Sequence, residues 1–250
     1  MSDGIYSALS GAIAQERNLS VVANNVANAG TTGFRADRVA FRETLAGASG
    51  DPDVVQPLRY VGVAEVGIDA APGTLESTGA PLDLALQGEG LFALQTNAGV
   101  RYTRAGSFRT DAEGLLRSPG GHQVLSAEGN PNDPRTAEIR IPEDAAEIVI
   151  GSDGTIHADG AEVGRLRIVR FDLAQLEKEG LTLFRAPDPL PAVLPGEVQV
   201  VQGSLETSNM NAVQGMTELI TASRAFDAFQ KVIDNFKQID ERAARDLAAR

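Results

Sequence analysis

The C-terminal segment 210–250 constrains the fold most, because it predicts one long uninterrupted helix. No Gly or Pro lies between Met216 and the end of the sequence. Apolar residues recur there at alternating steps of three and four, the spacing of a seam that packs on another helix: Leu219, Ala222, Phe226, Phe229, Ile233 and Phe236. Four more flank and widen the seam: Met216, Ile220, Val232 and Ile239. Burying one such phenylalanine contributes about 1.5–3 kcal/mol, so we expect the seam to have a partner.

The first thirty residues predict a second helix with a matching seam. Its members again step by four and three, with Glu16 as the one interruption: Ile5, Leu9, Ala12, Glu16, Leu19, Ala23 and Val26. Ser2 or Asp3 can cap the helix start, and the glycines of segment 29–33 end it. The two seams could pair to close an ordinary monomer, or each could meet helices of other copies in a polymer. Spacing alone does not separate these interpretations.

Composition excludes several classes of function. The 250 residues carry a net charge of −12, which disfavours nucleic acid as a partner. Most of that charge lies in the middle of the chain, whereas the predicted helices are nearly neutral. Cysteine is absent, so neither disulfides nor thiolate metal sites are expected. No apolar run approaches about 18 residues, so no membrane insertion is expected, and the N-terminus has no recognisable Sec-type signal peptide.

Between about Arg59 and Gln202 the apolar period changes to two, with a turn about every ten residues. This pattern predicts a β-rich domain resembling a sandwich or barrel. The expected class is α+β, with a coiled-coil-like helical assembly module (1–33 plus 204–250), a connecting segment (34–65) and a β-rich central domain (66–203). Segment 34–45 has helical spacing, but it is short and its assignment is ambiguous. Segments 46–57 and 186–195 are predicted to be loops, and segment 173–179 is predicted to form a short helix.

No motif predicts a catalytic, cofactor or metal site. Segment 88–93 fits G-x-G-x-x-A, but a predicted strand follows it, whereas a dinucleotide site needs a helix there. The only histidines, His122 and His157, belong to no nucleophile or metal-binding spacing. Two Asp-Gly turns lack the ligand series of a calcium loop. We therefore expect a non-enzyme without cofactors.

An asparagine-rich stretch ends the first predicted helix. Asn24, Asn25 and Asn28 fall within six residues, although asparagine competes for backbone hydrogen bonds in a helix interior. These side chains could cap backbone groups or bridge to a neighbouring subunit.

Four stretches together resemble the bacterial flagellar axial proteins, the subunits of rod and hook. Ser10-Gly11, Ala23–Asn28 and Thr32–Arg35 resemble the family's N-terminal signature. Segment 86–92 is similar to its L-x-G-x-G-F-F motif, with Leu91 in place of a common aromatic residue, and segment 102–108 to Y-T-R-x-G-x-F. Segment 203–211 resembles G-x-L-E-x-S-N-V-N, with Met210 in place of the usual Val. Within the family, segments 5–12 and 216–227 are most similar to proximal-rod subunits.

The resemblance implies a structural subunit of the flagellar basal-body rod, located within the periplasm. It further implies that terminal helices form the inner tube of the rod, contacting other copies and other rod proteins, and that the flagellar type III export apparatus secretes the chain. The candidate interface residues are Ile5, Leu9, Leu19, Asn24, Asn25, Val26, Leu219, Phe226, Phe229, Ile233 and Phe236. The alternatives are a distal-rod subunit or, in another class, a monomeric extracytoplasmic β-domain enzyme or binding protein.

Overall fold

The computed structural model describes residues 2–46, 58–130, 133, 136–170, 176–186 and 197–248. These residues form two compact units. The helical unit comprises the described residues of Met1–Ala27, Asp37–Gly67 and Asn211–Arg250, and the β-rich unit those of Asn28–Ala36 and Ile68–Met210. The protein is therefore α+β, with helices from both ends of the chain and a β-rich middle. None of the described helices is long and apolar enough to cross a membrane.

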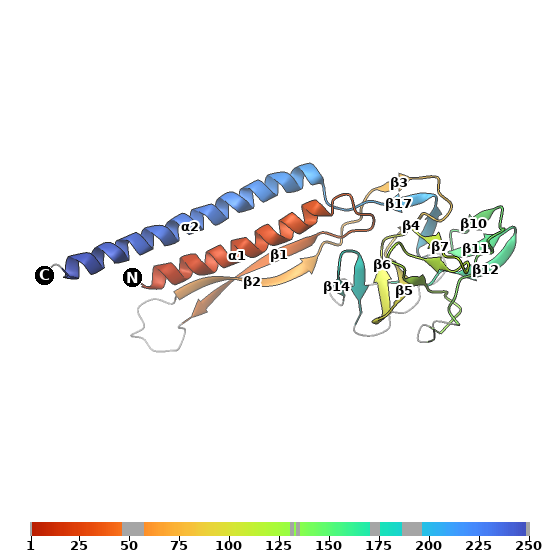
Figure 1. Cartoon of the computed structure of the whole chain (residues 1–250), viewed down its shortest axis with the longest axis horizontal. Helices are drawn as coiled ribbons and strands as arrows, with labels where there is room; N and C mark the ends of the chain where they lie inside the picture. Colours follow the sequence, from red (N-terminus) through yellow and green to blue (C-terminus); the bar gives the residue numbers. More distant parts are fainter. Residues whose placement is uncertain are drawn as a thin grey trace. The chain divides into compact units, whose positions relative to one another are not determined.

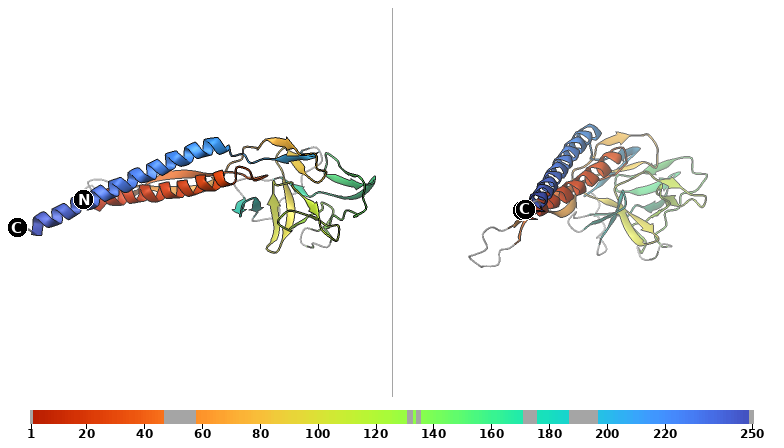
Figure 2. Two further views of the ribbon diagram at one scale, coloured as in Figure 1. Left: turned by 45° about the horizontal axis from the view of Figure 1, so that its top comes forward. Right: turned by 60° about the vertical axis from the view of Figure 1, so that its left-hand side comes forward.

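Two long helices dominate the helical unit. Helix α1 (Ser2–Ala27) and helix α2 (Ala212–Ala248) lie side by side and run in opposite directions (Figures 1 and 2). The unit also contains a two-stranded sheet of β1 (Asp37–Ala46) and β2 (Leu58–Ile68). Strand β1 contacts α1, so the helix pair and the paired strands form one body.

The helix pair is held by large rings packed on glycines. A Cβ atom built on Gly11 would lie 2.4 Å from a ring atom of Phe229, and one built on Gly4 would lie 2.8 Å from Phe236. Both distances are below van der Waals contact, so each ring occupies the space that a side chain would need. The two glycines are seven residues apart, as are the two phenylalanines, and this common spacing keeps the pair in register.

The buried face of α1 lies one residue from the predicted seam. The structure buries small and β-branched residues together with one amide: Ala8, Gly11, Ala12, Ala14, Val21, Val22 and Asn25. Leu9 of the predicted seam is 45% exposed. The reason is steric, since the phenylalanines of α2 need small partners, whereas a hydrophobicity pattern favours the larger isoleucine and leucine.

Asn25 joins α1 to the start of β1. Its side-chain nitrogen donates to the carbonyl oxygen of Asp37 at 2.8 Å, and its side-chain oxygen accepts the Asp37 backbone N–H at 2.9 Å. Asn25 is buried, and these two bonds satisfy both ends of its side-chain amide. The asparagine-rich end of α1 thus fixes where the sheet begins.

The β-rich unit contains fifteen strands in four sheets. The eight-stranded sheet has the order β14-β15-β6-β5-β9-β8-β7, with β13 also paired to β5. A three-stranded sheet has the order β10-β11-β12, and two pairs are β16-β4 and β17-β3. All of these pairings are antiparallel. The strands are β3 (Leu75–Ser77), β4 (Leu84–Gln87), β5 (Leu91–Thr96), β6 (Gly99–Thr103), β7 (Arg109–Thr110), β8 (Leu116–Arg117), β9 (Gln123–Val124), β10 (Ile148–Ile150), β11 (Thr155–Ala158), β12 (Ala161–Arg165), β13 (Ile168–Val169), β14 (Glu177–Glu179), β15 (Leu183–Arg185), β16 (Gln199–Gln202) and β17 (Ser204–Glu206).

Strand β5 is buried on both faces and separates two cores. Phe92 and Leu94 belong to one core, and Leu91 and Ala93 belong to the other. Successive side chains of a strand point to opposite faces, so one strand can serve both cores. Phe92 also packs edge-to-face on Phe108, with ring centroids 5.2 Å apart.

Several local predictions can be compared with the structure. The hairpin at 97–99 is confirmed, with Thr96 opposite Gly99. Segment 34–45, whose assignment was left ambiguous, contains most of β1 (Asp37–Ala46), so its helical spacing does not reflect a helix. The short helix at 173–179 is wrong where the structure describes it, because 177–179 forms β14; the rest of that prediction, 173–175, lies outside the described residues. Most of the two predicted loops, 47–57 and 187–195, also lies outside them. The connecting segment expected at 34–65 contains β1 and most of β2.

Gly11→Leu should destabilise the helix pair. The new side chain must displace Phe229, and overpacking of this kind costs about 1–3 kcal/mol or more. This outweighs the gain in helix propensity, which is about 1 kcal/mol. The measurement is the thermal midpoint of the helical circular dichroism signal. Gly30→Leu is the control, because a Cβ at Gly30 meets no described atom within 4 Å; equal midpoints for the two variants would contradict the packing.

Asn25→Asp should destabilise the helical unit by about 1–3 kcal/mol. The carboxylate keeps the acceptor but loses the donor to the Asp37 carbonyl, and it adds a buried charge. Chemical denaturation measures the change in the free energy of unfolding. Hydrogen exchange at the Asp37 amide measures the effect on the contact to β1. Asn24→Asp is the matched control, since Asn24 is exposed on the same helix end. If both variants lost the same stability, the contact to β1 would not be the cause.

Candidate assembly surface and buried ion cluster

Each helix carries a second apolar stripe that faces away from the helix pair. On α1 the stripe consists of Tyr6, Leu9 and Ile13, which are 45–58% exposed. On α2 it consists of Val213, Met216, Ile220, Val232 and Ile239, which are 42–76% exposed. The α1 residues, like the first three of α2, step by three and four, so they share one helix face. We call these two sets the outer stripes; apolar patches of this kind are typical of interaction sites.

The predicted interface residues fall into three groups. All five predicted on α2 are half-buried: Leu219, Phe226, Phe229, Ile233 and Phe236. Ile5, Leu19 and Val26 on α1 are also half-buried, whereas Leu9 and Asn24 are exposed and Asn25 is buried. Phe229 and Phe236 contact α1 of the same chain, and Asn25 binds β1. Of these residues, Leu9 alone belongs to an outer stripe.

Tyr6 and Ile13 were missed by sequence reasoning. The predicted seam of α1 was placed on Ile5 and Leu9, and Tyr6 and Ile13 lay beside it. The spacing of Tyr6, Leu9 and Ile13, at steps of three and four, was a signal that could have identified this second face of α1. On α2, by contrast, four of the five outer residues were already noted as flanking the seam.

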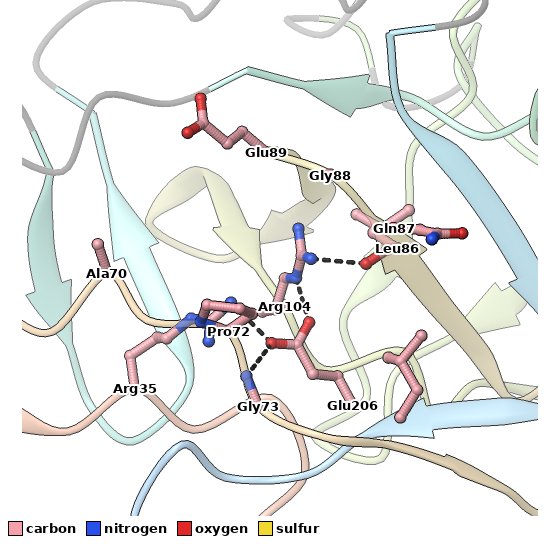
Figure 3. A pocket seen from close by; sticks show the side chains of 11 residues that line it. Arg35, Ala70, Pro72, Gly73, Leu86, Gln87, Gly88, Glu89, Arg104 and Glu206 are labelled. Carbon is pink, nitrogen blue, oxygen red and sulfur yellow. Dashed lines mark hydrogen bonds and ion pairs between the residues drawn. The ribbon is translucent and has the colours of Figure 1, made fainter.

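A buried ion cluster in the β-rich unit was also missed. Glu206 of β17 is 2% exposed and lies between two buried arginines, Arg35 and Arg104 (Figure 3). Glu206 Oε1 accepts Arg35 Nη2 at 2.7 Å and the backbone N–H of Gly73 at 2.9 Å, and Oε2 accepts Arg104 Nε. Each of the three charged residues lies in a different motif of the sequence. Their opposite charges were the available signal, although distance along the chain hides their proximity.

The arginines also hold neighbouring backbone segments. Arg104 donates from Nη1 to the Gly90 carbonyl at 2.5 Å and from Nη2 to the Leu86 carbonyl at 2.6 Å. Arg35 Nη1 donates to the Ala71 carbonyl at 2.5 Å. Burial lowers the pKa of the Arg35 guanidinium, and the Glu206 carboxylate opposes this by favouring the charged form. Removal of the Glu206 carboxylate would therefore leave both guanidinium groups buried without their counter-charge, which is costly.

The two histidines occupy structural positions. His122 lies in the turn after Ser118, where its backbone N–H donates to the Ser118 hydroxyl, and His157 lies within β11. Within the described part of the chain, no group of three or more His, Cys, Asp or Glu residues could hold a metal ion.

Glu206→Gln should destabilise the β-rich unit by about 3–5 kcal/mol, because it leaves two buried guanidinium groups without a carboxylate. The change in the free energy of unfolding is measured by urea denaturation, monitored through a spectroscopic signal of the β-rich unit. Glu177→Gln is the matched control. It removes the exposed ion pair to Arg185, and such solvent-screened pairs contribute little to stability. Similar urea midpoints for the two variants would show that the cluster is not important for stability.

Comparison with known families matches three segments of the chain. Residues 5–35 match a model described as "Flagella basal body rod protein". Residues 85–158 match "Flagellar hook protein FlgE/F/G D1 domain", and residues 201–246 match "Flagellar basal body rod FlgEFG protein C-terminal". Arg35, Arg104 and Glu206 fall one in each matched segment.

Relatives align with nearly the whole chain. The flagellar basal-body rod protein FlgF of Caulobacter vibrioides is 34% identical over 99% of this chain and 98% of its own length. FlgF of Rhizobium meliloti is 36% identical over 91% of this chain and 90% of its own length. FlgG of Bacillus subtilis is 33% identical over 96% of this chain and 97% of its own length. The chain therefore belongs to the family of flagellar basal-body rod proteins.

Proposed function

We propose that this chain is a structural, non-enzymatic subunit of the bacterial flagellar basal-body rod. The relatives named as rod proteins support this, since they align from end to end. The observation that carries the assembly mechanism is the pair of outer stripes. The helices already pack on each other through the phenylalanine seam, so the outer stripes are available for helices of other subunits.

The helical unit acts in this proposal as the assembly module. The steps of three and four on both faces of the helices suit coiled-coil-like packing with several neighbours. The β-rich unit, with its two cores on either side of β5, is sandwich-like in this interpretation and faces outward from the rod. The partners are other copies of this chain and other rod proteins.

Location and export follow from the same proposal. A rod subunit lies in the basal body within the periplasm, and the flagellar type III export apparatus would deliver it there. The FlgF relatives favour the proximal rod, and relatives named FlgG support the alternative of a distal-rod position. A monomeric extracytoplasmic enzyme or binding protein is the other class, and it leaves the outer stripes without a role.

Ile220→Asp, and separately Ile13→Asp, should block rod assembly and motility while the isolated chain stays folded. Each places a charge at a position that is more than half exposed in the subunit, so the subunit does not change its own packing. In an assembled rod the same charge would be buried without a partner. Swimming assays and mass spectrometry of purified basal bodies measure the outcome.

Gln230→Asp is the matched control, because it adds the same charge at an exposed polar position of α2. Wild-type motility with either stripe variant incorporated into basal bodies would contradict assembly through the outer stripes. Phe229→Asp is a poorer test than either, since Phe229 also packs on Gly11 within the chain. Loss of motility there would not distinguish misfolding from failed assembly.

A further inference from the structure

The contacts of the phenylalanine seam set the register of the helix pair. Gly4 of α1 packs on Phe236 of α2, and Gly11 packs on Phe229. A step of seven residues forward along α1 therefore matches a step of seven residues backward along α2. Positions on the two helices can accordingly be compared along their common axis, at a rise of about 1.5 Å per residue.

By this register, two exposed apolar groups of equal length lie at opposite ends of the pair. The outer stripe of α1 spans residues 6–13 and lies level with residues 227–234 of α2. The first three members of the outer stripe of α2 span residues 213–220 and lie level with residues 20–27 of α1. The centres of the two groups are about 14 residues apart, so about 20 Å separates them along the axis. We call the second group, Val213, Met216 and Ile220, the α2-start stripe.

The surroundings of the α2-start stripe suit the approach of another helix. Residues 20–27 of α1, which lie level with it, contain no charged side chain. The exposed residues among them are small or uncharged: Ser20, Ala23, Asn24 and Ala27. A neighbouring helix at this level would therefore bury no charge of α1, and burying an unpaired charge is the costly step in forming an apolar contact.

The positions of the two groups favour contact between copies that point in the same direction. If one copy is displaced by about 20 Å along the axis, its α1 stripe comes level with the α2-start stripe of its neighbour. Both groups have steps of three and four, which is the spacing of a helix–helix seam. The contact leaves each copy with one unused stripe of either kind, so it repeats along a polymer and does not close a dimer. In antiparallel order the facing pairs are Tyr6 with Ile220, Leu9 with Met216, and Ile13 with Val213.

We propose that the α1 stripe of one copy packs antiparallel on the α2-start stripe of a second copy of this chain, displaced by about 20 Å along the helix axis. This inference rests on the proposed function and adds the partner and the register of the contact. Three side chains on each helix bury far less than the roughly 1,200 Å² of a stable pairwise interface. Two free subunits therefore associate weakly, whereas a subunit at the end of a growing polymer gains from several such contacts together.

Cysteine cross-linking tests the contact, because the chain contains no cysteine of its own. In the double variant Leu9→Cys/Met216→Cys the two positions lie about 20 Å apart along the axis within one chain, whereas a disulfide needs Cα atoms within about 7 Å. Only two copies in contact can therefore form the bond. Mild oxidation of purified basal bodies should give a ladder of disulfide-linked oligomers of this chain, including species larger than a dimer.

Leu9→Cys/Gln238→Cys is the matched control and should give no ladder, since Gln238 is exposed on α2 outside the outer stripes. A disulfide dimer from Leu9→Cys alone would show that two α1 stripes pair with each other, and this would contradict the proposal. Incorporation of the double variant into basal bodies without a ladder would also overturn it, although the proposed rod function would stand. Absence of the wild-type chain from intact basal bodies would instead overturn the proposed function.

Charge complementation decides the case in which the cysteine variants are not incorporated. Leu9→Lys and Met216→Glu should each abolish swimming, because each buries a charge without a partner in the contact. The double variant Leu9→Lys/Met216→Glu should swim, since the two charges face each other across neighbouring copies. Leu9→Lys/Gln238→Glu carries the same two charges outside the proposed pairing and should remain non-motile. A double variant that swims no better than either single variant, or no better than this control, would overturn the proposal.

Discussion

The buried carboxylate of Glu206 is the contact on which the β-rich unit depends. It joins the segment that follows α1, the end of β6 and the strand that precedes α2, three places far apart in the chain. Through Arg104 and Arg35 it also fixes the backbone at Leu86, Gly90 and Ala71. Because the charges are inaccessible to water, their pairing is sensitive to geometry. The loss of one partner leaves the other charges buried without a counter-charge.

The helical unit uses a different principle, the fit of large side chains onto small ones. Phe229 and Phe236 occupy space left open by Gly11 and Gly4, so the helices approach closely without a wide hydrophobic face on α1. This contact does not use Tyr6, Leu9 and Ile13, which remain exposed on the outer face of α1. One helix pair can therefore satisfy its own packing and still present apolar surface to neighbours, as a polymerising subunit requires.

Prediction from sequence succeeded where the signal was local and periodic. The length of α2, its phenylalanine seam and the hairpin at 97–99 all follow from spacing and turn residues. Segment 34–45 could not be assigned from its sequence, because helical spacing coexists there with a strand that Asn25 anchors at Asp37 and that contacts α1. The register of α1 was missed by one residue, because the contact selects small side chains whereas the pattern weights large ones.

The sequence alone determined that both ends form apolar helices, that the middle is β-rich and acidic, and that its motifs resemble flagellar axial proteins. These properties depend on residue type and on short-range spacing along the chain. The tertiary structure decided which helix face is used within the chain and which face remains outside. It also brought Arg35, Arg104 and Glu206 together. The physical reason is that such contacts join residues far apart in the chain, 102 positions in the case of Arg104 and Glu206, whose proximity no local pattern encodes.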